Sequence, residues 1–557
     1  MDRNLLLAFA LSFLVLVTWQ FLQPPPPKPV PAQPTPAGAE AQPSTEQAPL
    51  QAARPTQARP SETTPQSDTP PEVVRVETPL YRAALSTRGA GLISWQLLKF
   101  RDSTARDAGP VELVTLGSRD EAALSTPSLE LGIGNLSRAP FRLVRHDEAT
   151  AVFEYAAGGL TLRKTFSFEP ERYEVHLEIE VQNDSPQAVN PGFWVSWPMV
   201  QRGAPKYFDE RLAVMHEGSV HRVPVGSVGE PGVLARWFTG AAGTTVPLFD
   251  GNVDWVAAES RYFLAAMVPD LPREAIGKFV KGDEQPTEAD ALLGFRPVEL
   301  PSAHHASRQI EVYVGPKDLA LLTAMGSHLE RTVDLGYTWV APLTRIFSGL
   351  LRASYSVIPN YGVAIILLTV LVRVATAPLT TRQMRSMTKM GNLQPRIKEI
   401  QEKYADDRQR QSQEMMKLYK ESGVNPLGGC LPILLQFPVF IGLYYALQSS
   451  IDLRHAPFFG WIRDLSAPEQ VGTLPILNLP IRVLPLVMGA SMVLQQRLTP
   501  STSMDPAQAR MMMTVMPIMF TVLFYQFPSG LVLYWLVSNL LAVAHQYWLK
   551  RSMAVAK

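Results

Sequence analysis

The sequence predicts a membrane protein in three parts: an N-terminal anchor helix, a large antiparallel β-sandwich, and a C-terminal α-helical bundle of five membrane spans. Three observations predict this fold class. An 18-residue apolar stretch occupies residues 5–22, apolar and polar residues alternate over much of 73–318, and long apolar runs appear after residue 319. A chain of 557 residues is also longer than one ordinary domain requires.

Residues 1–23 are expected to form an uncleaved transmembrane signal anchor. The apolar stretch has about the length that spans a bilayer, and no small-residue cleavage site stands near its end. Residues 24–72 are expected to form a disordered linker. Fifteen prolines stand among residues 24–71, and such a composition buries too little apolar surface to offset the entropy of ordering.

Residues 73–325 are expected to form the β-sandwich. Residues 173–181 read YEVHLEIEV, so that apolar side chains share one face and glutamate and histidine side chains share the other, which is expected to be solvated. Turn signals such as Gly158-Gly159 and Asn183-Asp184 separate runs of this kind. Antiparallel sheets with one packed face and one solvated face have this pattern.

Residues 335–557 are expected to form the membrane core. Its first segment mixes aromatic side chains with Arg345 and Arg352, which is typical of a helix lying in the membrane interface. Longer apolar runs follow it, each with a length near that of a membrane span. The predicted elements are an interfacial helix at 337–355 and spans at about 361–381, 427–449, 483–498, 511–527 and 531–549.

The segment 382–425 predicts the orientation of the chain. It contains ten Lys and Arg residues against six acidic residues, and short loops rich in Lys and Arg stay in the cytoplasm. Both termini are then cytoplasmic, and residues 24–360 are periplasmic. The segment is expected to be a helical hairpin, with helices at about Thr381–Tyr404 and Asp407–Glu421. Pro395 is expected to bend the first of these helices.

A permanent charge lies inside the second predicted span. Thr369, Arg373, Thr376 and Thr380 are spaced by four, three and four residues, which places them on one helix face. Inserting such a charge costs about 2.5–3.5 kcal/mol on translocon scales. None of the five C-terminal spans contains Asp or Glu. Arg373 therefore either reaches lipid phosphates, pairs with a loop acid such as Glu414, or receives a partner from outside the protein.

Other polar residues within the predicted spans are candidates for the same cavity. Each of them taken alone is more often a hydrogen bonder between helices. Tyr534, Ser538 and His545 share one helical face, so the last span is a candidate wall of the cavity. The candidates are Gln436, Ser491, Gln495, Thr514, Thr521, Ser538, Asn539 and His545.

The sequence offers little for enzyme chemistry. It contains no P-loop, GxSxG or HExxH pattern, and His304-His305 has no metal-ligating companions, so no catalytic site, cofactor or metal is expected. A net charge of +1 gives no argument for nucleic-acid binding. Cys430 is the single cysteine, so no intramolecular disulfide is possible.

Three long blocks carry a resemblance to a known family. They are VNPLGGCLPILLQFPVFIGLYYAL (424–447), APFFGWIRDLSAPE (456–469) and FPSGLVLYWLVSNLL (527–541). Together with the order of the segments, they resemble the YidC/Oxa/Alb membrane protein insertases, in the six-span form of Gram-negative bacteria. The resemblance implies that the β domain is a supersandwich similar to galactose mutarotases. It also implies a hydrophilic groove among the five C-terminal spans, open to the cytoplasm and to lipid.

The resemblance implies a function and a set of partners. The expected function is to insert and help fold inner-membrane proteins, alone or with the Sec translocon. Nascent membrane proteins and the lipid bilayer are expected partners. The ribosome is a further one, although only six residues follow Arg551, where family members often carry a longer basic tail. The implied substrate-binding groove comprises Arg373, Thr369, Thr376, Gln436, Tyr534, Trp535 and Ser538.

Two alternatives from other functional classes remain open. A solute transporter would use Arg373 as an anion site, although transporters usually show repeated halves and the sequence shows no such repeat. A membrane-tethered carbohydrate-binding module would instead use the β domain.

Overall fold

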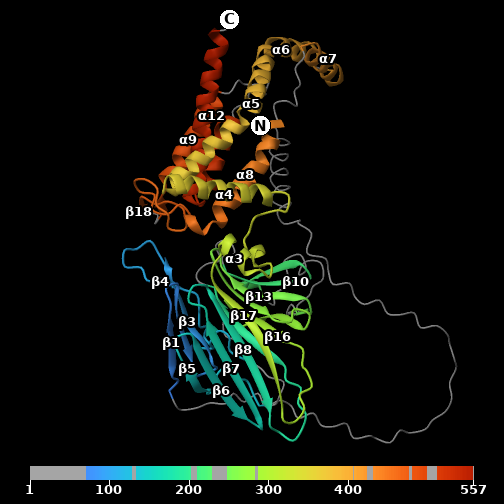
Figure 1. The fold of residues 1–557 in the computed structure, drawn as a ribbon. Coiled ribbons are helices and arrows are strands. Elements are labelled where there is room, and N and C mark those ends of the chain that lie inside the picture. Colours follow the sequence, from blue (N-terminus) through green and yellow to red (C-terminus); the bar gives the residue numbers. More distant parts are fainter. Residues whose placement is uncertain are drawn as a thin grey trace, which may run out of the picture.

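The computed structural model describes residues 70–127, 133–201, 210–228, 248–282, 287–405, 407–422, 431–475, 479–498 and 511–555. The predicted anchor at 1–23 and the predicted linker up to residue 69 lie outside the described residues. Strands occupy the first part of the described chain and helices the second (Figure 1). The fold class predicted from the sequence, a large antiparallel β region followed by helices, is confirmed.

Three sheets build the β region, and their strands pair antiparallel. The largest sheet has nine strands in the order β11-β10-β13-β14-β17-β8-β7-β6-β5, and two four-stranded sheets have the orders β1-β2-β3-β4 and β12-β15-β16-β9. The strands are β1 Val73–Glu77, β2 Tyr81–Ser86, β3 Gly91–Arg101, β4 Pro110–Glu112, β5 Arg142–His146, β6 Thr150–Ala157, β7 Leu160–Phe168, β8 Glu174–Asn183, β9 Phe193–Val200, β10 Arg211–His216, β11 Ser219–Pro224, β12 Leu248–Asp250, β13 Val253–Glu259, β14 Phe263–Pro269, β15 Ala275–Lys281, β16 Glu288–Phe295 and β17 His304–Pro316.

One hydrophobic core joins the three sheets. A single cluster of buried side chains takes members from each of them, including Trp95 of β3, Trp197 of β9 and Trp255 of β13. The sheets therefore pack face to face, as a sandwich requires. Tyr81 stacks on Trp95 with ring centroids 4.0 Å apart.

Strand β8 shows how far alternation predicts burial. Val175, Leu177, Ile179 and Val181 are buried, as the period of two predicts. Glu174 was expected on the solvated face, but this is wrong, because its side chain is buried. Glu174 is the first residue of β8 and pairs with Tyr313 of β17, and Arg172 lies 3.1 Å from its carboxylate. The guanidinium offsets only part of the cost of burial, because burial still raises the pKa of Glu174 above its usual value.

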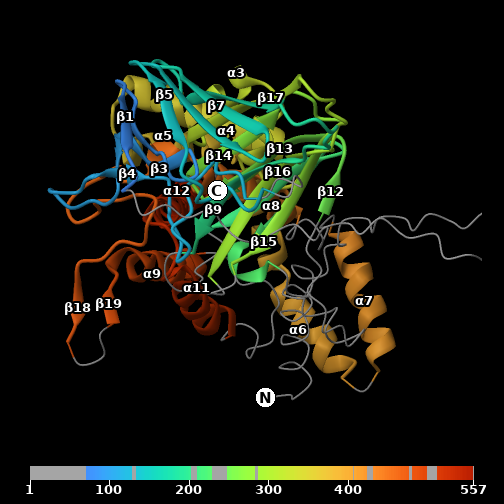
Figure 2. The same ribbon diagram turned by 90° about the horizontal axis from the view of Figure 1, so that it is seen from below.

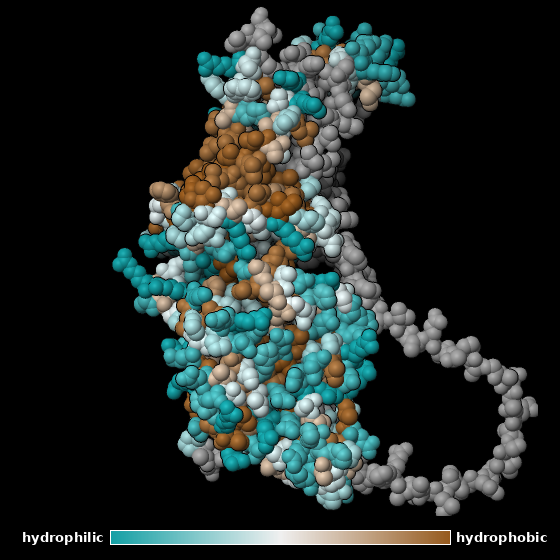
Figure 3. All heavy atoms as spheres, in the orientation of Figure 1, coloured by the Kyte–Doolittle hydropathy of each residue, from teal (hydrophilic) through white to brown (hydrophobic). Residues whose placement is uncertain are grey.

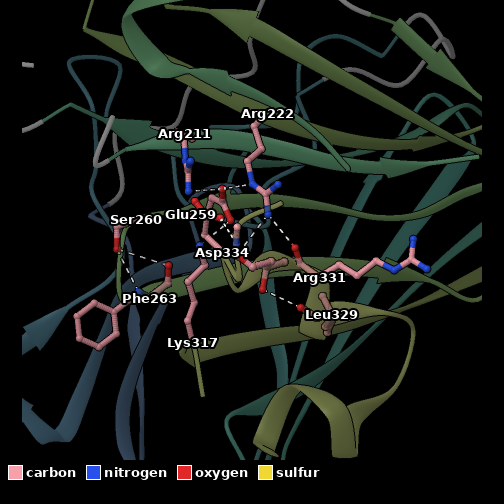
Figure 4. A network of polar contacts seen from close by, with 11 residues as sticks. Arg211, Arg222, Glu259, Ser260, Phe263, Lys317, Leu329, Arg331 and Asp334 are labelled. Atoms are coloured by element: carbon pink, nitrogen blue, oxygen red, sulfur yellow. Dashed lines mark hydrogen bonds and ion pairs between the residues drawn. The ribbon is translucent and has the colours of Figure 1, made fainter. Parts of the chain in front are cut away.

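A buried charge cluster fixes the end of the β region, and Figure 4 shows it from close by. The carboxylate of Glu259 has no exposed surface and lies 2.7 Å from Lys317 Nζ, 2.9 Å from Arg222 Nε and 3.1 Å from Arg211 Nη2. Burial alone would raise the pKa of Glu259, but Lys317, Arg222 and Arg211 outweigh burial and hold that pKa below its usual value. Arg222 also donates to the backbone oxygen of Arg331, so the cluster holds the connector to the helices.

The helical region follows this connector, and its boundaries differ in places from the predicted ones. Helix α4 begins at Ala341, four residues after the predicted start of the interfacial helix. Helix α5 continues to Asn392, beyond the predicted span 361–381. The described helices are α3 Leu319–Met325, α4 Ala341–Val357, α5 Tyr361–Asn392, α6 Gln394–Lys403, α7 Arg408–Glu421, α8 Leu431–Ser449, α9 Val483–Leu498, α11 Met516–Phe524 and α12 Ser529–Val555.

The predicted hairpin contains two helices after α5. The prediction of one helix from Thr381 to Tyr404 is wrong, because the helix breaks at Leu393 and α6 begins at Gln394. Pro395 stands in the first turn of α6, where its missing N–H costs nothing. Asp407 caps α7 by accepting from the backbone N–H of Arg410 at 3.0 Å.

One helical stretch among the described residues, Tyr361–Arg382, is long and apolar enough to cross a membrane. The other predicted spans are largely helical, but within the described residues none meets both criteria. Their crossing of the membrane stays a prediction. Figure 3 shows hydrophobic side chains gathered over the helical region, whereas the β region is largely hydrophilic on the same face.

Polar contacts join the β region to the helices. Arg352 of α4 lies 2.7 Å from Asp318, at the start of α3, and 3.0 Å from Asp452, just after α8. Arg454 donates to the backbone oxygen of Arg101 in β3, and Arg261 donates to the backbone oxygen of Gln448 in α8. The β region therefore rests on the loop that follows α8.

Candidate functional site: Arg373 and the α5–α12 interface

The polar face predicted in the second span is present on α5. Its threonines direct their hydroxyls to carbonyls of their own helix: Thr369 donates to Ile365 at 2.6 Å and Thr376 donates to Val372 at 2.9 Å. Back-bonding of this kind satisfies a hydroxyl without any external partner. The threonines can therefore lie in an apolar region at little cost.

Arg373 behaves differently, because its side chain reaches another helix. Its Nε and Nη2 donate to Ser538 Oγ of α12 at 3.0 and 2.5 Å. A hydroxyl accepts hydrogen bonds but does not neutralise the guanidinium. No carboxylate in the described part of the chain forms an ion pair with Arg373, and the pairing with Glu414 considered from the sequence is not formed. Among these residues, the hydrogen bonds from the guanidinium go to a neutral hydroxyl.

A second polar contact joins α5 and α12 farther along the two helices. Thr381 Oγ1 lies 3.1 Å from Nε2 of His545, eight residues beyond Arg373 on α5 and seven beyond Ser538 on α12. Both contacts advance in the same direction, so α5 and α12 run parallel, as Figure 1 also shows. Sequence reasoning missed Thr381, although a spacing of eight residues places it on the helix face of Arg373.

Helix α12 also bonds to a third helix. Asn539 Nδ2 donates to Ser491 Oγ of α9 at 3.0 Å, and both side chains are buried. This is the helix-to-helix role expected of isolated polar residues within spans. These two candidates therefore serve packing, whereas Ser538 on the neighbouring position faces Arg373.

The predicted aromatic pair of the groove divides between two environments. Tyr534 is buried and interacts with Ser538 and Arg373. Trp535 packs instead against Phe440 of α8 and Phe524 of α11, with ring centroids 4.9 Å away in each case. The structure thus brings together Arg373, Tyr534 and Ser538, while the partly buried Trp535 packs against α8 and α11.

The remaining predicted groove residue is Gln436. It belongs to helix α8, but its side chain lies outside the described residues. Among the described residues, no group of three or more His, Cys, Asp or Glu side chains could hold a metal ion.

Comparisons with known proteins cover nearly the whole chain. The family model for the YidC periplasmic domain matches residues 73–349, and that for the 60Kd inner membrane protein matches residues 353–556. A relative from Nitratidesulfovibrio vulgaris, named membrane protein insertase YidC, is 36% identical over 494 residues, which cover 86% of each chain. A relative of the same name from Syntrophobacter fumaroxidans is 35% identical over 595 residues, covering 99% of this chain and all of that one.

A solved structure described as an active YidC insertase, with its first transmembrane domain resolved, also matches. It is 18% identical, covers 86% of this chain and 94% of its own, and superposes with a TM-score of 0.36, too low to establish a shared arrangement of the parts. The family models and the sequence relatives confirm the resemblance seen in the three long blocks. The chain therefore belongs to the YidC family of inner membrane proteins.

Proposed function

We propose that this chain inserts proteins into the inner membrane and helps them fold, alone or with the Sec translocon, through a hydrophilic groove with Arg373 at its centre. One observation supports the role of Arg373 most directly. The guanidinium lies in the middle of α5, and its contacts in the described chain are made to a neutral hydroxyl rather than to an acid. The names of the relatives support the insertase activity.

The groove would shorten the distance over which a polar segment must cross the membrane without contact with water. A polar tail must cross the apolar core of the bilayer, and water reaching halfway through the membrane would shorten the dry part of that path. Arg373 then attracts an acidic residue of the incoming tail. At an effective dielectric constant near 20, an ion pair at 4 Å is worth about 4 kcal/mol before the cost of desolvation is subtracted. The net attraction holds the tail transiently.

The geometry of the Arg373 guanidinium suits this role. Guanidinium has five N–H donors, and Ser538 accepts from Nε and Nη2. The Nη1 end of the group is left to receive a carboxylate while Ser538 keeps its contact. A client carboxylate would therefore add to the contact between α5 and α12 instead of replacing it.

The apolar segment of the client follows another path. We propose that it passes between α5 and α8, which correspond to the second and third predicted spans, and enters the lipid. Burial of its apolar surface in lipid drives this step, so no nucleotide is required. Thr369, Thr376, Gln436, Tyr534, Trp535 and Ser538 are the proposed neighbours of the client in the groove.

The proposed topology has six spans with both termini in the cytoplasm and residues 24–360 in the periplasm. The proposed units are the anchor at 1–23, the linker at 24–72, the β domain at 73–325 and the membrane core at 335–557, with its basic hairpin at 382–425. We assign no enzymatic role to any of them. Nascent membrane proteins, the Sec translocon and the ribosome are the proposed partners.

The β domain is proposed to be accessory to insertion. Most of its hydrophobic core is separate from that of the helical bundle, because the two clusters share no residue and only Ile451, after α8, enters the β cluster from the described part of the bundle. Deletion of residues 80–310 is expected to leave insertion largely intact, measured in cells depleted of the wild-type protein. Loss of insertion by a deletion variant that still reaches the membrane would show that the β domain is required.

The role of Arg373 is tested with matched variants and matched clients. Arg373→Ala should slow the insertion of a client with an acidic tail by about tenfold, the effect of losing about 1.4 kcal/mol. The same client with its tail acids changed to amides should insert equally well with either protein. Arg373→Lys should insert both clients if charge alone matters. Thr380→Ala, on the same face, is the control and should change neither client.

Protease protection of the translocated tail, in proteoliposomes with equal amounts of each variant, measures the effect. Normal insertion of the acidic client by Arg373→Ala would remove Arg373 from the mechanism. An equal loss for acidic and amide clients would assign Arg373 a structural role instead.

A further inference from the structure

A small β-hairpin projects from the helical region between α8 and α9. Its strands are β18 Gly472–Leu474 and β19 Leu479–Ile481, which pair antiparallel. Figures 1 and 2 show the hairpin extending sideways at the end of the helical region nearest the β domain, at about the level of α4. A two-stranded ribbon of this size is marginally stable in water unless something covers one of its faces.

One face of the hairpin is apolar and exposed. Leu474 lies directly opposite Leu479 across the ribbon, and Ile481 lies opposite Gly472 on the same face. Their side chains are 43%, 45% and 38% exposed for Leu474, Leu479 and Ile481. The opposite face carries Thr473. Neighbouring leucines that expose this much surface indicate a face made to contact something outside the described chain.

The hairpin is fixed to the bundle at its base. The hydroxyl of Tyr525, after α11, donates to the backbone oxygen of Pro480, and Arg482 donates to the backbone oxygen of Tyr525. The backbone N–H of Leu484 donates to Glu469 Oε1 at 2.7 Å, which closes the same loop from the other side. The apolar face is therefore held in one orientation relative to α9 and α11.

Exposed apolar side chains continue from the hairpin in both directions. Phe459 and Trp461, earlier in the same loop, are 73% and 43% exposed, and the exposed Arg463 follows them. On α9, Leu486 and Val487 are exposed directly after the hairpin. Tryptophan beside arginine is typical of the boundary between lipid headgroups and acyl chains. The hairpin thus joins the interfacial loop to the apolar surface of the bundle, the band seen in Figure 3.

We propose that the face of the β18–β19 hairpin formed by Leu474, Leu479 and Ile481 is a lipid-binding surface that rests in the membrane leaflet on the side of the β domain. Continuity with the apolar surface of the membrane helices supports lipid as the occupant. The hairpin would then brace α9 and α11 laterally against the leaflet, through the contacts of Arg482 and Tyr525. This inference depends on the membrane location of the family and not on insertase activity.

Spin labelling of adjacent positions tests the proposal. In a Cys430→Ser background, a nitroxide is attached at Leu474→Cys or at the matched control Thr473→Cys, which points to the opposite face. The full chain is placed in nanodiscs of phosphatidylethanolamine and phosphatidylglycerol. Collisions of each label with oxygen, which concentrates in lipid, and with a nickel chelate, which stays in water, are then compared.

The label at position 474 should favour oxygen over the nickel chelate by several-fold relative to the label at position 473. Equal accessibility of both labels to the nickel chelate would overturn the proposal, because the face would be in water. Shielding of the label at 474 from both reagents would also overturn it, because a protein surface would then cover the face. Neither outcome bears on Arg373, since the measurement requires no client.

Discussion

Glu259 is the acid shared by Lys317, Arg222 and Arg211, and replacing it tests whether this cluster stabilises the β region. The change Glu259→Gln keeps the size of the side chain but leaves Lys317, Arg222 and Arg211 facing one another without the carboxylate. Lys317 is 4% exposed and cannot regain water. Removing one partner of a buried ion pair costs about 3–5 kcal/mol. The arginines are about a quarter exposed or less, so partial solvation favours the lower end of that range.

Lys317→Met is the matched control. It removes one cation and leaves Glu259 with two arginines, so the buried carboxylate remains compensated. The loss of stability should therefore be distinctly smaller than for Glu259→Gln. Methionine also fills most of the space of the lysine stem, which limits the effect of lost packing.

Pulse proteolysis in urea measures both variants in the detergent-solubilised full chain, with cleavage inside the β region followed by mass spectrometry. A loss of about 3 kcal/mol should lower the urea midpoint by about 1–3 M, given typical slopes for domains. A Glu259→Gln midpoint equal to that of the wild type would refute the reasoning. So would a larger loss for Lys317→Met than for Glu259→Gln.

Three further predictions concern other charged or polar groups. Burial lowers the pKa of Lys164 from 10.5 to about 7. Between these two pH values the unfolded chain binds the proton and the folded chain does not, so the free energy of unfolding should rise from pH 7 to 9. Urea titrations of Lys164→Met should show a smaller rise. Ser538→Ala removes the acceptor of Arg373 and should destabilise the bundle by about 1.5–3 kcal/mol, which a lower melting temperature in detergent would show. Acidic clients should still insert in the protease-protection assay. An insertion defect as large as that of Arg373→Ala would contradict this prediction. Arg352→Gln breaks two partly exposed ion pairs and should cost about 1 kcal/mol at low salt and little at 1 M salt, measured by hydrogen exchange in α3.

The sequence predicts the strands well where one face of a sheet is buried. The alternation of residues 173–181 identifies β8, because a period of two admits one register against the core. It does not predict that Glu174 is buried, because its surroundings depend on β17, which is more than 100 residues away in the chain. The cluster around Glu259 escapes prediction for the same reason, since it joins β10, β11, β13 and the residue after β17.

In the helical region too, the sequence predicts some features and not others. Apolar runs predict where α5 and α9 begin, because a span is a local property of composition. Pro395 predicts a bend in the first arm of the hairpin. The end of α5 at Asn392 is not predicted, since the helix continues well past the apolar run into polar residues that suit a helix equally well. The face of Arg373 is predicted from spacing alone, and Ser538 is predicted to line the same cavity. The hydrogen bond between them is not predicted, because the two residues lie 165 positions apart in the chain.

The threonines of α5 bear on how selective the chain is toward its clients. Their hydroxyl protons are already given to carbonyls of their own helix, so those groups offer few directed bonds by which one peptide sequence could be told from another. The positive charge of Arg373 is then the main feature by which this helix face would distinguish one client from another. In the proposed role, such a surface would select clients by the sign of their charge and tolerate wide variation in the rest of their sequence.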